Sequence, residues 1–334
     1  MKTGKRILIL LTVLIFVGGA GSFFYFKNKF MNAEPNRLTV SNLGEPFSFM
    51  WTSHDYGERT EPHSAMFVPV RITDIDQTFY MQFDTGAPST VLYYNKVKSI
   101  NEKYGDILRI DTVDNRVRVR DVSLNIGTVH VKASSMDFRG MSNAIDWSNT
   151  DSSSIIVLGT VGSDFMENNP LIIDYKNNHI TLTSSIPDSL QAGSDYLPFT
   201  FDGRKIFLSA ELNGEPASLW FDSGSSDNEL IVEEKTFLKL AKPGAERETY
   251  KINSWGTKIN KHVIESEGTF RFGDTTVPLT KVSNFEWPNK LQAFILKASN
   301  IGGDLGGMTG NKLFIGKTLV LDAPNLRYAL IQSD

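Results

Sequence analysis

The chain of 334 residues is 40% hydrophobic and 22% charged, which is ordinary for a globular protein and long enough for two domains. Its formal net charge of −4 lacks the basic excess typical of nucleic-acid-binding proteins, so we expect no nucleic-acid partner. Cysteine is absent, which excludes disulfides, thiolate metal sites and cysteine nucleophiles. The five histidines show no metal-ligand spacing, and the sequence predicts neither a metal nor a cofactor.

An uncharged apolar segment near the start of the chain, Ile7–Phe26, is long enough to cross a bilayer. Basic residues are slightly in excess on its N-terminal side, which favours a body outside the cytoplasm, periplasmic or at the cell surface. Small residues at Gly18–Ser22 leave a cleaved signal peptide, and hence secretion, as the alternative. We favour an uncleaved membrane anchor within residues 1–30, because the apolar run continues beyond the usual end of a signal core.

The segment that follows, residues 31–62, is expected to be a stalk or linker between the anchor and the folded body. A propeptide is the alternative, although no processing site is marked. Beyond this segment the sequence predicts short strands separated by Gly, Asn, Asp and Pro turns. Short helices are expected only after Asp164 and at Glu233–Ala241.

The predicted N-terminal lobe, residues 63–190, opens with a hairpin that runs into Asp84-Thr85-Gly86. Apolar residues alternate in both strands of this hairpin, on either side of a turn-like middle. A hydrophobic stretch ending in Val161-Gly162 comes later, and a closing hairpin follows it. The polar and broken segment Ser184–Pro198 makes a good connection to the second half.

The predicted C-terminal lobe, residues 191–334, repeats this order of features. Asp222-Ser223-Gly224 lies 138 positions after the first tripeptide, and the hairpins before the two align without a gap. Thr309-Gly310 corresponds to Val161-Gly162 at an offset of 148. One such tripeptide is more often a structural turn than a catalytic one. Its repetition in matched surroundings predicts two related lobes, each supplying one aspartate to a common site.

The residue types in the two tripeptides suit acid–base chemistry. Two carboxylates about 3 Å apart cannot both ionise, so the pair shares one proton. The ionised partner can then deprotonate a water molecule while the protonated one polarises a peptide carbonyl. Gly86 and Gly224 permit the tight turns that bring amide groups close to the carboxylates.

This arrangement resembles the pepsin and retropepsin group of aspartic proteases over roughly residues 65–334. The resemblance implies an all-β fold of two pseudo-twofold-related, β-barrel-like lobes. It implies an endopeptidase that cleaves peptide or protein substrates, with Asp84 and Asp222 as its catalytic residues. Thr85 and Ser223 would bond to the backbone of the opposite loop, and the hydrophobic-Gly elements would support the loops. Because one chain holds both lobes, a monomer would carry a complete dyad.

The residue after each glycine differs between the halves: Ala87 in the first and Ser225 in the second. In pepsin-like enzymes a hydroxyl at this place donates to the outer carboxylate oxygen, whereas retroviral enzymes carry Ala. A donor to the ionised form lowers the pKa of a carboxylate. The missing donor is therefore expected to shift the working range upward, toward weakly acidic or neutral pH.

Two segments stand where a flap over the cleft is expected, at Thr112–Arg116 and at Trp255–Ile259. Trp255 is the more suggestive, because an exposed aromatic side chain at a mobile tip can press on a substrate. Both segments are equally consistent with ordinary hairpin tips.

Two other functions remain open. The first is a catalytically silent, protease-like module that binds peptides or a partner protein, although the presence of both aspartates argues against it. The second is a purely structural, membrane-tethered β protein. A purely structural role would not explain why the aspartate turn is repeated in both halves.

Overall fold

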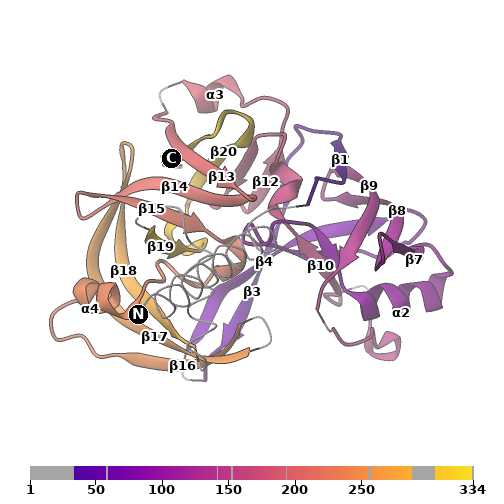
Figure 1. Cartoon of the computed structure of the whole chain (residues 1–334), viewed down its shortest axis with the longest axis horizontal. Coiled ribbons are helices and arrows are strands. Elements are labelled where there is room, and N and C mark those ends of the chain that lie inside the picture. The colour runs from indigo at the N-terminus through magenta and orange to yellow at the C-terminus, as the bar shows by residue number, and fades with distance from the viewer. Residues whose placement is uncertain are drawn as a thin grey trace, which may run out of the picture.

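A computed structural model describes residues 34–57, 59–140, 142–151, 153–192, 194–254, 257–287 and 305–332 (Figure 1). Strands dominate these residues and form two sheets, so the expected all-β class is confirmed. The apolar segment Ile7–Phe26 lies outside the described residues. Within them, no helix combines the length and hydrophobicity that a membrane crossing requires.

In the described part of the chain, the first sheet has nine strands in the order β1-β9-β6-β10-β5-β4-β8-β7, with β3 beside β4. Most neighbouring strands are antiparallel, but β10 runs parallel to β5 because a long crossover separates them in the chain. The strands are β1 (Leu38–Ser41), β3 (Met50–Asp55), β4 (Thr60–Ile72), β5 (Phe79–Phe83), β6 (Val91–Leu92), β7 (Ile110–Val113), β8 (Arg116–Ile126), β9 (Val129–Phe138) and β10 (Val157–Val161).

The second sheet has twelve strands among the described residues, in the order β16-β17-β14-β13-β21-β20-β11-β12-β2. Off this path, β15 pairs with β14 and, in parallel, with β19, while β18 pairs with β17. The strands are β2 (Phe47–Ser48), β11 (Leu171–Asp174), β12 (His179–Leu182), β13 (Leu197–Asp202), β14 (Lys205–Leu212), β15 (Glu215–Phe221), β16 (Glu248–Ser254), β17 (Thr257–Phe272), β18 (Thr275–Glu286), β19 (Leu305–Thr309), β20 (Lys317–Asp322) and β21 (Arg327–Gln332).

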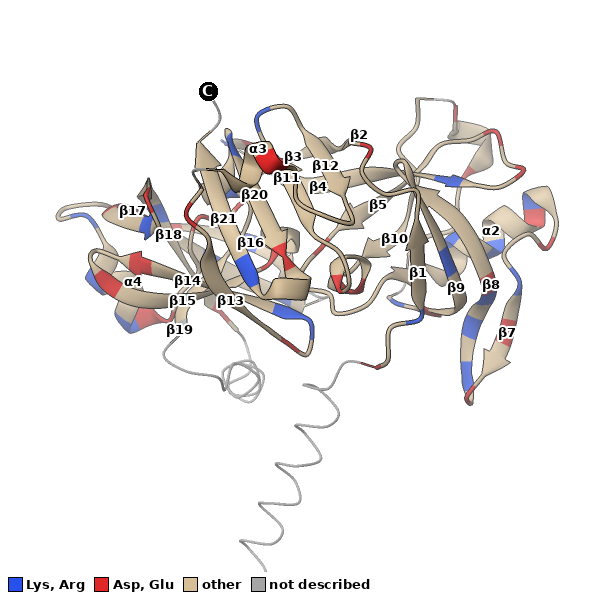
Figure 2. Ribbon diagram, turned by 90° about the horizontal axis from the view of Figure 1, so that it is seen from above, with Lys and Arg blue, Asp and Glu red and all other residues tan. Residues whose placement is uncertain are grey.

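The closing hairpins of the two halves join in one sheet. Strands β11 and β12 belong to the predicted N-terminal lobe, yet β11 pairs with β20 of the second half, with Leu171 opposite Leu321. Each half therefore contributes its closing hairpin to a common layer, β11 and β12 from one and β20 and β21 from the other (Figure 2). Hydrogen bonds across this layer hold the halves in a defined relative position.

The helices are short. A 3₁₀ turn, η2 (Ser163–Met166), follows Gly162, and α4 (Glu234–Leu240) covers the second expected helix. The sequence reading missed α2 (Tyr94–Tyr104), the longest helix of the described chain. Its apolar spacing is weak, since Val97 and Ile100 are its only buried hydrophobic residues. Packing against the first sheet stabilises it, rather than a strong helical pattern.

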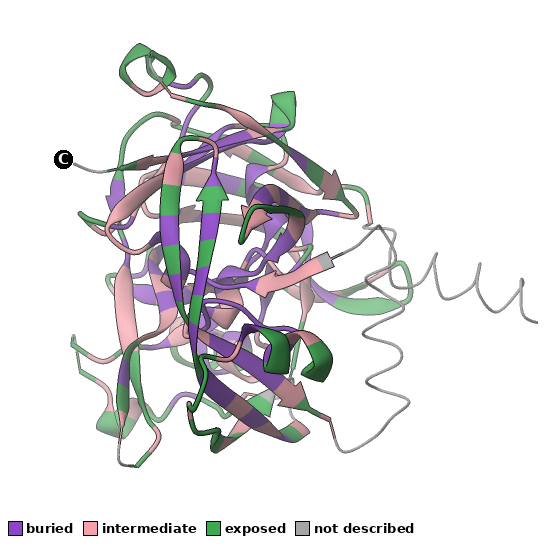
Figure 3. Ribbon diagram, turned by 90° about the vertical axis from the view of Figure 1, so that its left-hand side faces the viewer, coloured by how far each residue is buried: buried purple, intermediate pink, exposed green. Residues whose placement is uncertain are grey.

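Buried and exposed residues alternate along the strands, which is the pattern of sheets with one face in a core (Figure 3). Aromatic side chains fill the core directly beneath the two aspartate turns. Phe83 meets Phe165 edge to face with ring centroids 6.4 Å apart, and Phe221 meets Phe314 at 5.3 Å. These four rings are at most 2% exposed, so the turns rest on a rigid apolar base.

Residues of the segment expected to be a stalk take part in both sheets. β1 pairs with β9, β2 pairs with β12, and β3 pairs with β4. Glu34 joins an ion-pair cluster around Arg118 of β8, whose guanidinium also meets Asp114 (2.9 Å) and Asp137 (2.6 Å). Arg118 lies in a run of basic residues on β8 (Figure 2) and is 1% exposed, so the acidic partners compensate a buried charge.

Candidate active site

Both aspartate turns begin where a strand with a parallel partner ends. After β5, the backbone N–H of Asp84 donates to the carbonyl of Val161 in β10 (3.0 Å). After β15, the N–H of Asp222 donates to the carbonyl of Thr309 in β19 (2.9 Å). The two turns therefore occupy equivalent places in the two halves of the molecule.

Reciprocal hydrogen bonds join the two turns. The hydroxyl of Thr85 donates to the carbonyl of Phe221 (3.2 Å) and accepts from the N–H of Ser223 (2.9 Å). The hydroxyl of Ser223 donates to the carbonyl of Phe83 (3.0 Å) and accepts from the N–H of Thr85 (2.9 Å). Thr85 is 1% exposed and Ser223 is fully buried. Because buried polar groups are costly to leave unpaired, these four bonds fix the register of the turns.

The glycines of the turns allow each carboxylate to lie against the opposite backbone. A Cβ atom on Gly86 would lie 2.5 Å from Cγ of Asp222, and one on Gly224 would lie 2.6 Å from Cγ of Asp84. Real Cβ atoms essentially never come this close to other heavy atoms. Any larger residue at either position would displace the facing carboxylate.

The hydrophobic-Gly elements pack beneath the turns, at the places expected from the sequence. A Cβ on Gly162 would lie 2.5 Å from the carbonyl carbon of Ser89, and one on Gly310 would lie 2.6 Å from that of Ser225. Each glycine thus lets its strand pass directly under the loop that follows the aspartate. The side chain of Asn311 adds a further bond under the second turn, from its amide to the carbonyl of Ser223 (2.9 Å).

A second buried carboxyl, Asp164, lies beneath the first turn. It accepts hydrogen bonds from the backbone N–H of Thr90 (2.8 and 2.9 Å) and from the Thr90 hydroxyl (2.7 Å). These donors favour the ionised form, but burial is the larger effect and raises the pKa of Asp164 to about 6. Asp164 lies behind the loop that holds Asp84, and it is a structural residue.

Replacing Asp164 with Asn is expected to remove part of the pH dependence of stability. The pKa of this carboxyl is raised in the folded state. Its contribution to the free energy of unfolding is therefore present at low pH and is lost as pH rises through about 6. The free energy of unfolding of wild type should therefore fall, relative to Asp164→Asn, by on the order of 2 kcal/mol between pH 5 and 7.5. Urea unfolding at several pH values measures this difference, and parallel curves for the two proteins would contradict it.

The carboxyl groups of Asp84 and Asp222 interact directly, and each influences the pKa of the other. Burial raises the pKa of Asp84, against the bond with Asp222, the positive charge of Arg139 and two backbone N–H groups. Burial raises the pKa of Asp222 well above its usual range, and the negative charge of Asp84 raises it further. Asp222 is 8% exposed whereas Asp84 is half-buried. The arrangement therefore favours a proton on Asp222 and a negative charge on Asp84.

The residues after the two glycines, Ala87 and Ser225, differ in whether their side chain donates a hydrogen bond to the neighbouring aspartate. The Ser225 hydroxyl donates to Oδ2 of Asp222 (3.2 Å), whereas Ala87 supplies only its backbone N–H to Oδ1 of Asp84 (3.1 Å). Because Asp84 lacks the hydroxyl donor that Asp222 has, this difference alone would make the pKa of Asp84 the higher of the two. Arg139, which the sequence reading did not single out, works in the opposite direction because its charge lowers the pKa of Asp84.

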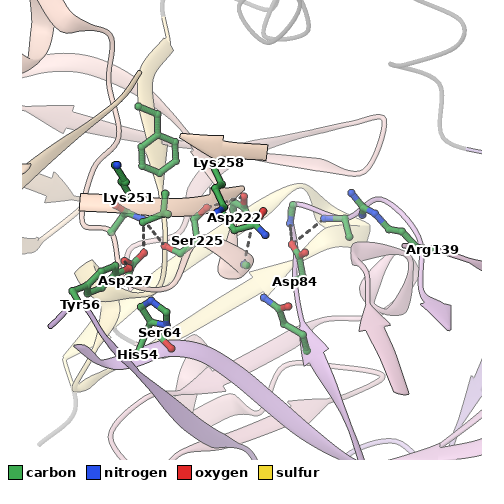
Figure 4. Close-up of a pocket in the computed structure, with 18 residues that line it drawn as sticks. His54, Tyr56, Ser64, Asp84, Arg139, Asp222, Ser225, Asp227, Lys251 and Lys258 are labelled. Carbon is green, nitrogen blue, oxygen red and sulfur yellow. Dashed lines mark hydrogen bonds between the residues drawn. The ribbon is translucent and has the colours of Figure 1, made fainter. Parts of the chain in front are cut away.

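The two aspartates lie at a cleft of about 680 Å³ (Figure 4). Both halves line it, and the described residues that do so include the following: His54, Tyr56, Ser64, Gln82, Asp84, Gly86, Ala87, Arg139, Asp222, Gly224, Ser225, Asp227, Asn228, Lys251, Ile252, Asn253, Lys258 and Phe285. A cleft of this size can hold several residues of an extended peptide.

The hairpin that overhangs the cleft belongs to the second half. Lys251, Ile252 and Asn253 of β16 and Lys258 of β17 line it, whereas none of its described lining residues comes from Thr112–Arg116. Trp255, the expected flap residue, lies outside the described residues.

The hairpin of β3 and β4 forms a wall that the sequence reading missed. Its tip reaches the second half, where the Tyr56 hydroxyl donates to Oδ2 of Asp227 (2.7 Å) and Lys261 pairs with the same oxygen (2.6 Å). Nearby, the buried carboxylate of Glu61 pairs with Arg59 (2.9 Å) and with Lys312. Asp227 comes five residues after Asp222 in the chain. The network therefore ties this wall to the second aspartate turn.

No protein-family model matches the chain, and no curated protein sequence matches it significantly.

Proposed function

We propose that the protein is an aspartic endopeptidase of the pepsin and retropepsin type, which cleaves peptide bonds with a water molecule held between Asp84 and Asp222. One observation carries the proposal: two aspartates on symmetric, mutually hydrogen-bonded turns each lie against the opposite turn, at a cleft that both halves line. An arrangement made only for stability has no need of two buried carboxyls in contact, because their mutual repulsion is costly.

In the proposed mechanism Asp84 is ionised and removes a proton from the water, whose oxygen then attacks the carbonyl carbon of the substrate. Asp222 starts protonated and donates to the carbonyl oxygen, so no full negative charge develops there. As the tetrahedral intermediate collapses, Asp84 gives the proton that it took from water to the amide nitrogen and the C–N bond breaks. Asp222 recovers a proton from a hydroxyl of the intermediate, which leaves as a carboxylic acid. No step in this sequence requires a cofactor, and one chain supplies both carboxyls.

The N-terminal segment completes the proposal. We infer that residues 7–26 anchor the protein in a membrane with its two lobes on the extracytoplasmic side, because of the length of the apolar run and the basic residues before it. Secretion after cleavage of this segment is the alternative. Protease digestion of intact cells, followed by immunoblotting for the body of the protein and for an N-terminal tag, distinguishes these two outcomes from a cytoplasmic body.

The activity is tested by incubating the purified full-length protein, in a mild detergent, with a peptide library over a range of pH. Cleavage at defined bonds that a statine-type inhibitor blocks supports the proposal, since the statine hydroxyl takes the place of the attacking water. Binding of peptides without cleavage at any pH would instead favour the silent binding module.

Two substitutions are expected to move opposite limbs of the pH–rate profile. Ala87→Ser adds a hydroxyl donor beside Asp84, which should lower the pKa of the ionised partner and shift the acidic limb to lower pH. Ser225→Ala removes the donor to Asp222, whose pKa is already raised, and should shift the alkaline limb to higher pH.

The profiles are measured as kcat/KM against pH with one cleaved peptide. The two variants serve as controls for each other, because each changes one hydroxyl at equivalent positions. An acidic limb that Ala87→Ser leaves in place would overturn the assigned role of this position.

A further inference from the structure

The acidic groups that line the cleft are largely neutralised by their own neighbours. In the proposed mechanism Asp84 and Asp222 share one proton, which leaves one negative charge, and the positive charge of Arg139 acts on Asp84. The carboxylate of Asp227 is paired with Lys261, whose side chain is 6% exposed. Within the described lining of the cleft these are the only carboxylates.

Two cationic groups of the cleft have no such compensation. Lys251 and Lys258 are exposed on the overhanging hairpin, and among the described residues no ion pair, hydrogen bond or ring contact engages the ammonium group of either side chain. In the view of Figure 4, Lys258 lies near Asp222 and Lys251 lies closer to Asp227. The uncompensated charge of the cleft is therefore positive, and it is concentrated on the second half.

The register of the hairpin directs both lysines to one face. Lys258 lies opposite Asn253, and Lys251 is two residues before Asn253, so all three side chains project from the same side of the ribbon. Glu286 is an acidic residue close to this face, but Asn260 and His262 already donate to its carboxylate. The carboxylate of Glu286 is thus already engaged, and the lysines remain available to a ligand.

We propose that this face selects substrates with acidic side chains close to the scissile bond, which Lys251 and Lys258 bind through their carboxylates. The inference rests on the proposed endopeptidase function and specifies its substrate class. An extended peptide in the cleft would pass beneath the hairpin, where alternate side chains point toward the lysines. Phe285 also lines the cleft, but it pairs with Lys261 and therefore projects from the opposite side of the ribbon.

The test compares peptides of equal length that carry Glu, Gln or Lys at the positions flanking the cleaved bond. Full-length wild type is compared with Lys251→Glu/Lys258→Glu near neutral pH, where peptide carboxylates are ionised. Lys235→Glu/Lys239→Glu is the matched control, because it makes the same change in net charge on exposed lysines of α4 that do not line the cleft.

Wild type and the control variant should cleave the Glu peptide with a higher kcat/KM than the Lys peptide. The Lys251→Glu/Lys258→Glu variant should lower this ratio by about tenfold, and about 0.5 M salt should weaken the preference in wild type. Equal cleavage of the three peptides by wild type, or an equal fall in the control variant, would overturn the inference while leaving the endopeptidase proposal intact.

If wild type cleaves none of the peptides, the endopeptidase proposal fails, and fluorescence anisotropy with the same labelled peptides still decides the charge preference. Tighter binding of the Glu peptide that is lost only in Lys251→Glu/Lys258→Glu supports an acidic ligand. Equal binding of the Glu and Lys peptides overturns it.

Discussion

Replacement of either aspartate of the dyad by Asn is expected to lower kcat for peptide cleavage by at least about a thousandfold. Asp84→Asn removes the group that accepts the proton of the water. Asp222→Asn removes the acid that protonates the carbonyl oxygen, although an amide can keep part of the hydrogen bonding. Because the two groups act as one unit, the double variant should be little worse than either single one.

The measurement is single-turnover cleavage of one peptide by purified full-length variants. Asp76→Asn, at an exposed position of the first half, is the control for loss of one negative charge and should cleave like wild type. Both dyad variants should remain folded and bind peptide, since relief of the repulsion between two buried carboxyls favours the folded state. Cleavage that survives either substitution would exclude the dyad as the catalytic group.

The hydrogen bonds between the turns should be required for both stability and activity. Thr85→Val keeps the volume of the side chain but leaves the buried N–H of Ser223 without its acceptor. Ser223→Ala does the same to the N–H of Thr85. The double variant is expected to lose about 2–5 kcal/mol of unfolding free energy. A shift of the carboxylates by even about 1 Å should lower kcat about a hundredfold.

Thermal unfolding and peptide cleavage measure the two effects in the same samples. Thr276→Val, on the exposed side of β18, is the control for replacement of a hydroxyl by a methyl group and should change neither quantity appreciably. A double variant that unfolds like wild type and retains full activity would show that other contacts fix the turns.

Several features of the candidate site follow from the sequence because they depend on short-range constraints. A turn in which a carboxylate accepts from the backbone N–H groups that follow it favours Asp with Gly two residues later. The repetition of this turn at a constant offset predicts two equivalent strands and two supports, and the structure has them at β5 and β15 and at Gly162 and Gly310. The alternation of apolar residues likewise predicts an all-β body.

Other features depend on contacts between residues far apart in the chain, and no local pattern marks them. Arg139 follows β9 in an ordinary polar segment, and only folding brings its charge to Asp84. The tip residue Tyr56 lies in a segment expected to be a stalk, yet it meets Asp227 across the cleft. α2 was missed because its helical spacing is weak and packing decides its conformation.

By itself, the sequence determined the repeated Asp-Thr/Ser-Gly turn, its glycine supports and the β character of the body, because each arises from neighbouring residues and their period. The tertiary structure decided which aspartate is the more deeply buried, which hairpin overhangs the cleft and which charges remain uncompensated there. These properties depend on burial and on distances between side chains of different strands. The sequence contains all of these residues, but only the tertiary structure shows which of them come into contact.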